Sequence, residues 1–239
     1  MSTALITGSN RGLGLEFVRR LSVTGWRVLA TCRSPDQAEA LRRLASESRQ
    51  TVEVHALDTG DQKSIGALSA AVGDQAIDLL VCNAGVSQLK QALITGAAGQ
   101  RIQDADDALW FEVYRTNAIG PLRVAAAFAD RVVASESRLM AFMSTRMSVA
   151  GQNNSGAYYM YRSSKAALNV IVKNLSIELA PRGVTCIALH PGWVRTDMGG
   201  RNADVSPEES VTGMLKILLD AKLPKKAQFL DYSGETVPW

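Results

Sequence analysis

Two side chains that lie four residues apart, Tyr161 and Lys165, could act as an acid/base pair. They open the apolar run Ala166–Val172, which predicts a helix on which both side chains share one face. A free phenol has a pKa of about 10, which is too high for easy proton exchange at neutral pH. An ammonium group within a few ångströms favours the phenolate and lowers this pKa. The same spacing also occurs on ordinary amphipathic helices, so the interpretation depends on the rest of the chain.

A glycine-rich segment, residues 7–14 with the sequence Thr-Gly-Ser-Asn-Arg-Gly-Leu-Gly, follows the first predicted strand and opens the first predicted helix. Glycines let a backbone turn tightly and approach a pyrophosphate, and a helix N-terminus offers unpaired N–H groups. The spacing Gly-x-x-x-Gly-x-Gly differs from the commonest dinucleotide fingerprint and alone could be a simple turn. Its position predicts a dinucleotide cradle formed by Gly8, Asn10, Arg11, Gly12, Leu13 and Gly14.

The end of the second predicted strand bears on which dinucleotide is bound. NAD sites usually place an Asp or Glu there for the ribose 2′-hydroxyl, whereas this chain has Cys32 followed by Arg33. An arginine pairs with a 2′-phosphate, and Arg11 could supply a second positive charge. Both could instead be solvated surface arginines. The missing acid together with the two bases favours NADP(H) over NAD(H).

Further candidate ligands follow the third and fourth predicted strands, at the edge where parallel strands form a ligand crevice. Asp58 could hydrogen-bond the adenine amino group or could merely cap the next helix. Asn83, Ala84 and Gly85 come after the fourth strand, where small residues would let the chain pass under the cofactor.

Strand-like and helix-like segments alternate along the chain, which predicts right-handed crossovers and a parallel sheet covered on both faces. No linker divides residues 1–239, so we expect one α/β domain with a doubly wound sheet. The predicted strands are Thr3–Thr7, Arg27–Cys32, Val52–Ala56, Ile77–Cys82, Leu139–Met143, Val184–Leu189 and Gln228–Leu230. The predicted helices are Leu13–Thr24, Pro35–Ser48 (capped by Ser34), Asp61–Val72, one or two over Asp104–Ala134, Tyr161–Ala180 and Ser206–Leu219.

Composition excludes several classes of function. The net charge of +3 is spread along the chain without a block of Lys or Arg, so nucleic-acid and membrane-surface binding receive little support. The apolar runs are too short to span a bilayer, and a strand that begins at Thr3 leaves no room for a signal peptide.

The cysteines and histidines indicate neither disulfides nor a metal. Cys32, Cys82 and Cys186 are an odd number at scattered positions, which is typical of reduced thiols in a cytoplasmic protein. His55 and His190 are the only histidines, and no Cys/His group has the spacing of metal ligands.

Taken together, the motifs resemble those of the short-chain dehydrogenase/reductase family over essentially the whole chain. They are the glycine turn with Gly8, Gly12 and Gly14, then Asp58, Asn83-Ala84-Gly85, Asn117, Tyr161 with Lys165, and Pro191-Gly192. Residues 161–169, 190–200 and 234–239 look like the sniffer-type carbonyl reductase and C-factor branch. The resemblance implies a Rossmann domain and an NADPH-linked oxidoreductase.

The resemblance also implies individual roles. Tyr161 would give a proton to the substrate carbonyl oxygen, and Lys165 would lower the pKa of this tyrosine and hold the nicotinamide ribose. Asn117 would hold a water that links Lys165 to solvent, although without the other motifs it reads as a helix-interior Asn bonded locally. The residues expected near the nicotinamide carboxamide are Pro191, Gly192, Val194 and Thr196, which leaves His190 as a strand-end residue.

One motif departs from the family. A serine pair usually follows the fifth strand, and its second serine binds the substrate oxygen, but this chain has Met143-Ser144-Thr145-Arg146-Met147-Ser148. Alignment on the strand end assigns the role to Thr145, whose extra methyl group restricts its rotamer. The family's common spacing back from Tyr161 selects Ser148 instead, and Ser144 is a third option. We favour Thr145.

The leading functional prediction is an NADPH-dependent carbonyl reductase that acts on small aldehydes, ketones or quinones, or on the corresponding alcohols. One alternative is a signalling or sensing protein of the C-factor type that binds NADP without turnover. Another is an epimerase or dehydratase, but such relatives usually have a longer C-terminal substrate region.

The resemblance bears on the substrate pocket and on assembly as well. The short stretch Met198–Val205, rich in Gly and Asp, predicts an open pocket with loose selectivity. Trp193, Met198 and Gln88–Gly99 are candidate walls, although each could equally serve ordinary packing. Helices that begin near Arg115 and Tyr161 resemble those of the family's four-helix dimer interface, so we expect a homodimer. Their apolar faces could equally be buried on the sheet.

Overall fold

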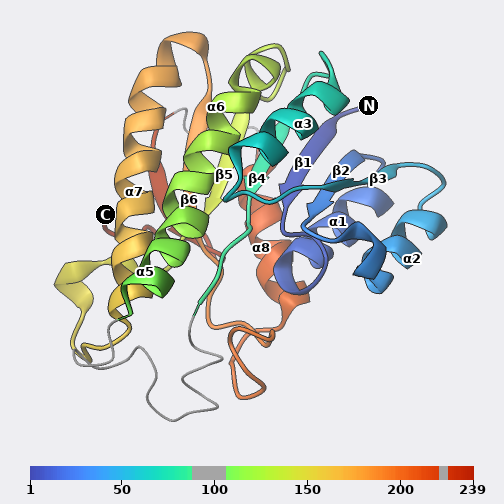
Figure 1. Ribbon diagram of the computed structural model, residues 1–239. Helices are drawn as coiled ribbons and strands as arrows, with labels where there is room; N and C mark the ends of the chain where they lie inside the picture. Colours follow the sequence, from blue (N-terminus) through green and yellow to red (C-terminus); the bar gives the residue numbers. More distant parts are fainter. Residues whose placement is uncertain (88–105, 221–225) are drawn as a thin grey trace.

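Seven parallel strands form one sheet in the order β3-β2-β1-β4-β5-β6-β7 (Figure 1). A computed structural model describes residues 1–87, 106–220 and 226–239. The strands are β1 Thr3–Thr7, β2 Arg27–Cys32, β3 Val52–Ala56, β4 Leu79–Cys82, β5 Leu139–Met143, β6 Thr185–His190 and β7 Gln228–Asp231. The doubly wound parallel sheet predicted from the sequence is confirmed. The bounds of β1, β2, β3 and β5 are those predicted, and the ends of β4, β6 and β7 differ by one or two residues.

Helices cover both faces of this sheet (Figure 1). The helices are α1 Gly12–Val23, α2 Glu39–Glu47, α3 Gln62–Val72, α5 Asp107–Tyr114, α6 Gly120–Val133, α7 Tyr159–Leu179 and α8 Pro207–Leu218. Side chains alternate along each strand, so β1 contributes Leu5 to one core and Ala4 and Ile6 to the other. The first core contains residues of α3, α6 and α7, and the second contains residues of α1, α2 and α8.

The predicted helix over residues 35–48 is wrong in its first part. Pro35–Gln37 form a single 3-10 turn, and α2 begins only at Glu39. Between them Ala38 has φ −91° and ψ 64°, which interrupts helical hydrogen bonding. Its methyl group is buried with the side chains of α1 and α2, so packing against the core has overridden local helix propensity.

The predicted helical region up to Ala134 is two helices joined by a wider turn. Residues Arg115–Ile119 form a π-helical segment between α5 and α6. Single π turns inside helices occur frequently at functional sites, and this one contains Asn117.

No helix in the described part of the chain is long and apolar enough to cross a membrane.

The start of α1 approaches the glycine turn so closely that only glycine fits at position 14. A Cβ at Gly14 would lie 2.1 Å from the carbonyl oxygen of Gly8 and 2.7 Å from Nδ2 of Asn83. Gly66, in the interior of α3, has no atom within 4 Å of a Cβ built there.

We expect Gly14→Ala to lower the free energy of unfolding by about 1–3 kcal/mol, because backbone must move to make room for the methyl group. Gly66→Ala is the matched control and should raise this free energy by about 0.5–1 kcal/mol, since a helical alanine loses less entropy on folding. Urea denaturation monitored by circular dichroism measures both. Equal effects of the two substitutions would contradict the close approach at Gly14.

Candidate active site

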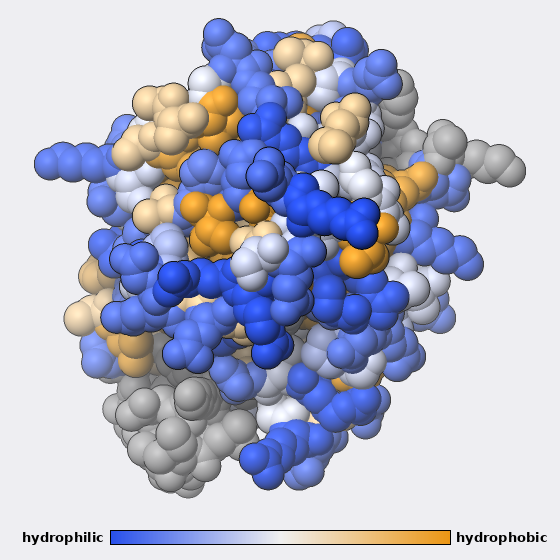
Figure 2. Space-filling model, turned by 90° about the vertical axis from the view of Figure 1, so that its right-hand side faces the viewer, coloured by the Kyte–Doolittle hydropathy of each residue, from blue (hydrophilic) through white to orange (hydrophobic). Residues whose placement is uncertain are grey.

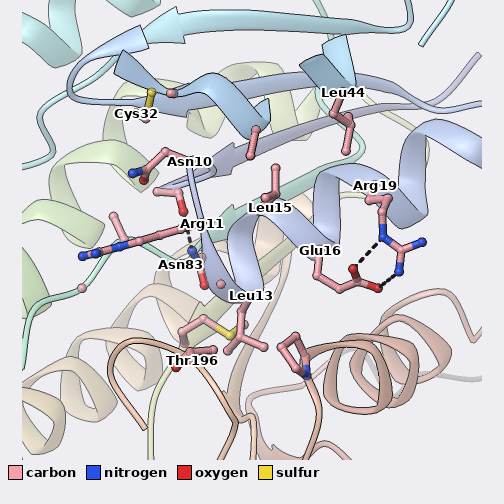
Figure 3. A pocket seen from close by; sticks show the side chains of 18 of the residues that line it. Asn10, Arg11, Leu13, Leu15, Glu16, Arg19, Cys32, Leu44, Asn83 and Thr196 are labelled. Carbon is pink, nitrogen blue, oxygen red and sulfur yellow. Dashed lines mark hydrogen bonds and ion pairs between the residues drawn. The ribbon is translucent and has the colours of Figure 1, made fainter. Parts of the chain in front are cut away.

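A continuous cleft of about 1440 Å³ runs along the carboxyl edge of the sheet and onward between α1 and α2. Figure 3 shows part of its lining around the start of α1. Most of the predicted cofactor residues line this cleft. They are Gly8, Asn10, Arg11, Gly12, Leu13, Arg33, Asp58, Asn83, Ala84, Gly85, Tyr161, Lys165, Pro191 and Thr196.

The glycine turn and the loop after β4 are packed directly together. Gly8 has φ +71°, and a Cβ there would lie 2.9 Å from the Cα of Ala84. The side-chain amide of Asn83 donates hydrogen bonds to the carbonyl oxygens of Thr7 and Gly8, at 3.0 and 3.1 Å. The first turn of α1 contains no acidic residue. This arrangement leaves backbone and a helix N-terminus exposed to an anionic ligand.

The two arginines predicted for a 2′-phosphate have different surroundings. Arg33 is exposed at the end of β2, lines the cleft and has no carboxylate beside it in sequence. Arg11 instead forms an ion pair with Asp197, with 2.8 Å between Nη1 and Oδ2, so a carboxylate already faces the second positive charge considered for the phosphate. Both members of this pair are largely exposed, so it contributes little stability.

Asp58 is not the cap of the next helix. That role belongs to Asp61, whose side chain accepts a hydrogen bond from the backbone N–H of Lys63 at 2.9 Å. Oδ1 of Asp58 accepts from the N–H of Gly60 at 2.8 Å while its side chain lines the cleft. The cap role considered for Asp58 is therefore wrong, and its contact with the adenine amino group stays a prediction.

Tyr161 and Lys165 both lie on α7 and line the cleft, but the expected lowering of the tyrosine pKa is wrong. Protein atoms around the ring displace water and raise the pKa of Tyr161 to about 12. Burial lowers the pKa of Lys165 to about 8, and its Nζ donates a hydrogen bond to the carbonyl oxygen of Met143 at 2.7 Å. At neutral pH the pair is therefore a protonated phenol and a predominantly charged ammonium group four residues apart on one helix.

Asn117 is fully buried and is not bonded locally. Its Oδ1 accepts from the N–H of Val86 at 2.8 Å, and its Nδ2 donates to the carbonyl oxygen of Val86 at 2.9 Å and to Oγ of Ser164 at 3.1 Å. A Cβ at Gly85 would lie 3.3 Å from Oδ1 of Asn117 and 3.6 Å from Nζ of Lys165. Asn117 and Lys165 therefore lie beside the same glycine, and the π-helical segment is tied to both the β4 loop and α7.

The three candidate hydroxyls after β5 differ in their hydrogen bonds. Ser144 lines the cleft and donates to Oδ1 of Asn169 at 2.6 Å. Ser148 is buried and donates to the carbonyl oxygen of Thr145 at 2.5 Å. Oγ1 of Thr145, also buried, accepts from the N–H of Met147 at 3.2 Å. Among the described residues, its own proton has no acceptor.

The segment after β6 contributes fewer lining residues than predicted. Pro191 and Thr196 line the cleft, whereas Val194 is buried and pairs with Val205. Gly192 has φ +85° and packs against the ring of Tyr232. Oγ1 of Thr196 donates to the carbonyl oxygen of Val194 at 3.3 Å and accepts from the N–H of Gly199 at 3.2 Å.

His190 ends β6, and burial and the nearby Arg146 lower its pKa to about 4. It is neutral at physiological pH, consistent with a strand-end residue.

Among the candidate walls of the substrate pocket, Met198 lines the cleft. Trp193 is half exposed, and its Nε1 donates a hydrogen bond to the carbonyl oxygen of Gly199 at 2.8 Å. Gln88–Gly99 lie outside the described residues.

Sequence reasoning missed several polar contacts of the site. Asn169 was not singled out, although it is buried and bonded to Ser144 and Ser148. A polar residue inside an apolar helical run, one turn beyond Lys165, was the available signal.

In the described ranges, no group of three or more His, Cys, Asp or Glu side chains is arranged to hold a metal ion.

Known proteins match this chain in both sequence and structure. The sequence model of the family described as short chain dehydrogenase matches residues 2–206. The chain belongs to the short-chain dehydrogenase family. Among curated proteins, the C-signal of Myxococcus xanthus is 40% identical over 163 residues, which cover 68% of this chain and 93% of that protein.

Solved structures of carbonyl reductases are also similar. An NADPH-bound carbonyl reductase from chicken fatty liver is 32% identical, with a TM-score of 0.90, and the match covers 100% of this chain and 99% of that one. Carbonyl reductase Sniffer of D. melanogaster is 29% identical, with a TM-score of 0.84 and full coverage of both chains. These matches confirm the predicted family and its carbonyl reductase and C-factor branch. The chain is an oxidoreductase of this short-chain dehydrogenase family.

Proposed function

We propose that the protein reduces carbonyl groups of small aldehydes, ketones or quinones with NADPH. The observation that carries this proposal is the pair at the cleft, a phenol that stays protonated at neutral pH and an ammonium group four residues away on the same helix. A protonated phenol suits the reductive direction, in which the substrate oxygen must receive a proton. The similarity to NADPH-bound carbonyl reductase supports the same direction.

The lining of the cleft fits NADP(H). The glycine turn and the start of α1 would hold the pyrophosphate, because they offer backbone N–H groups without an acidic side chain. Arg33 would pair with the 2′-phosphate, which a carboxylate at this position would repel. Asp58, beside the same stretch of cleft, would accept a hydrogen bond from the adenine amino group.

When bound, NADPH supplies a hydride to the carbonyl carbon of the substrate. Tyr161 donates its phenolic proton to the carbonyl oxygen, which takes the electron pair of the π bond and becomes a hydroxyl. The positive charge of Lys165 stabilises the phenolate left on Tyr161. Thr145 donates a hydrogen bond to the same substrate oxygen, because the protons of Ser144 and Ser148 already have acceptors.

A second candidate function is NADP binding for signalling with little turnover, which the 40% identity to the C-signal favours. A sensor has no need for a protonated phenol and a buried lysine that line one cleft, with an uncommitted hydroxyl on the residue after Ser144 of the same lining. Reduction therefore remains the better supported function. NADPH binding without turnover of any carbonyl in a broad panel would reverse this preference.

The first test is NADPH oxidation with a panel of aldehydes, quinones and diketones. We expect Tyr161→Phe to lower kcat by about 10²- to 10⁴-fold, because it removes the proton donor, while NADPH binding changes little. Tyr159→Phe is the matched control, since Tyr159 is an exposed tyrosine on the same helix, and it should retain activity. Unchanged turnover in Tyr161→Phe would contradict the proposed acid.

The choice of cofactor is tested at Arg33. Arg33→Ala should raise the Kd for NADPH by about 10- to 100-fold, since a charge-assisted bond to phosphate is worth about 1.5–3 kcal/mol. Binding of NADH, which lacks the 2′-phosphate, should hardly change. Arg123→Ala is the control, because Arg123 lies on α6, across the sheet from α1. Isothermal titration calorimetry measures each affinity, and an equal loss for both cofactors would refute the role of Arg33.

We also infer a homodimer through α5 and α7, which pack against each other (Figure 1). Phe111 on α5 is 75% exposed, and Val170 and Ile177 on α7 are exposed on one helical face seven residues apart. These side chains are therefore not buried on the sheet. The end of the molecule formed by β3 and α2, in contrast, is mostly hydrophilic with small separate hydrophobic patches (Figure 2).

Sedimentation velocity at micromolar concentration tests this assembly. We expect the wild type to sediment as a dimer and Phe111→Asp to shift it toward monomer, because a buried unpaired charge at an interface is costly. Val23→Asp is the control, since Val23 is 76% exposed at the end of α1, on the other side of the sheet. A wild type that is monomeric at this concentration would overturn the inference.

A further inference from the structure

Asn169 lies one helical turn beyond Lys165 on α7 and is buried against the segment that follows β5. Asparagine is disfavoured inside helices unless its side-chain amide has hydrogen-bond partners, and the partners of Asn169 lie outside its own helix. Its Oδ1 accepts a hydrogen bond from Ser144 at 2.6 Å, and its Nδ2 donates to Ser148 at 2.8 Å. One side chain thus holds both ends of residues 144–148.

Thr145 lies between these two anchored serines. Ser148, held by Asn169, donates in turn to the carbonyl oxygen of Thr145 at 2.5 Å. The network fixes the backbone of Thr145 and uses the protons of both neighbouring serines. Of the three hydroxyls, only that of Thr145 keeps a proton without an acceptor in the described part of the chain.

We infer that Asn169 is a positioning residue that makes Thr145 the hydroxyl that binds the substrate oxygen. Asn169 engages the two competing serines and holds the segment between them against the helix that carries Tyr161 and Lys165. This inference rests on the proposed carbonyl reduction, because it assigns a partner for the substrate oxygen in that reaction.

The role of Thr145 is tested first. Thr145→Ala should lower kcat by about 10²- to 10³-fold, the usual effect of removing one donor to a developing oxyanion. Thr145→Ser keeps the hydroxyl and should restore activity to within a few-fold of wild type. Full activity of Thr145→Ala would overturn the inference, because the substrate oxygen would then be bound elsewhere.

The role of Asn169 is tested by a double-mutant cycle. Asn169→Ala should lower kcat by about 10- to 100-fold, because a misplaced donor loses most of its effect. In the Thr145→Ala background the same change should cost less than about threefold, since the residue that it positions is already gone. Asn174→Ala is the matched control, because Asn174 is an exposed asparagine on the same helix. Additive losses would show a general structural role and would overturn the inference.

A readout that needs no turnover separates this inference from the proposed reaction. In hydrogen–deuterium exchange without cofactor, Asn169→Ala should accelerate exchange of residues 144–149 at least several-fold and leave β1 unchanged. If the wild type reduces no carbonyl but exchange of residues 144–149 accelerates in Asn169→Ala, then Asn169 holds this segment and the proposed reaction is wrong. Unchanged exchange would show that Asn169 does not hold the segment and would overturn the inference. Should Asn169→Ala not fold, Asn169→Asp, which cannot donate to Ser148, replaces it in both experiments with the same criteria.

Discussion

The carboxyl ends of β1 and β4 are joined by a set of hydrogen bonds on which the whole cleft depends. Oγ1 of Thr7 accepts from the N–H groups of Asn83 and Ala84 at 3.0 and 2.9 Å, and the Asn83 amide donates back to the carbonyl oxygens of Thr7 and Gly8. These two strands are neighbours at the point where the strand order reverses. Open α/β sheets bind ligands at this switch point, because the flanking loops diverge there. The bonds hold the two loops together at their base.

Local patterns in the sequence predicted the elements well, because parallel strands are continuous apolar runs and the helices between them are amphipathic. All seven strands lie where they were expected. The failure at Ala38 has a physical origin that local patterns do not contain. Burial of its methyl group against α1 and α2 overrides helix propensity, and this burial depends on residues that are distant in sequence. The π-helical turn at Asn117 was missed for the same reason, since its side chain is fixed by Val86 and Ser164.

The site was predictable as a set of positions and much less so as a set of interactions. Residues that follow parallel strands must meet at one edge, so the glycine turn, Asp58 and Asn83 could be placed together from sequence alone. The partner of Arg11 could not be predicted from sequence, because Asp197 is 186 residues away along the chain. The direction in which the pKa of Tyr161 shifts could not be predicted either. This direction depends on the surroundings of the ring in the fold, and here burial raises the pKa.

The polar side chains of Ser164, Lys165 and Asn169 are buried on α7, and the cost of burying each depends on its hydrogen-bond partners. Ser164 and Asn169 each have hydrogen-bond partners, so their burial costs little. Lys165 differs, because an ammonium group has three donors and only one of them reaches an acceptor, the Met143 carbonyl, among the described residues. Its lowered pKa is the signature of this incomplete solvation. An ammonium group that lines a cleft and has unused hydrogen-bond donors binds an oxygen-rich ligand more strongly than a fully solvated ammonium group would. The same deficit that weakens the folded protein would therefore favour the ribose contact predicted for Lys165.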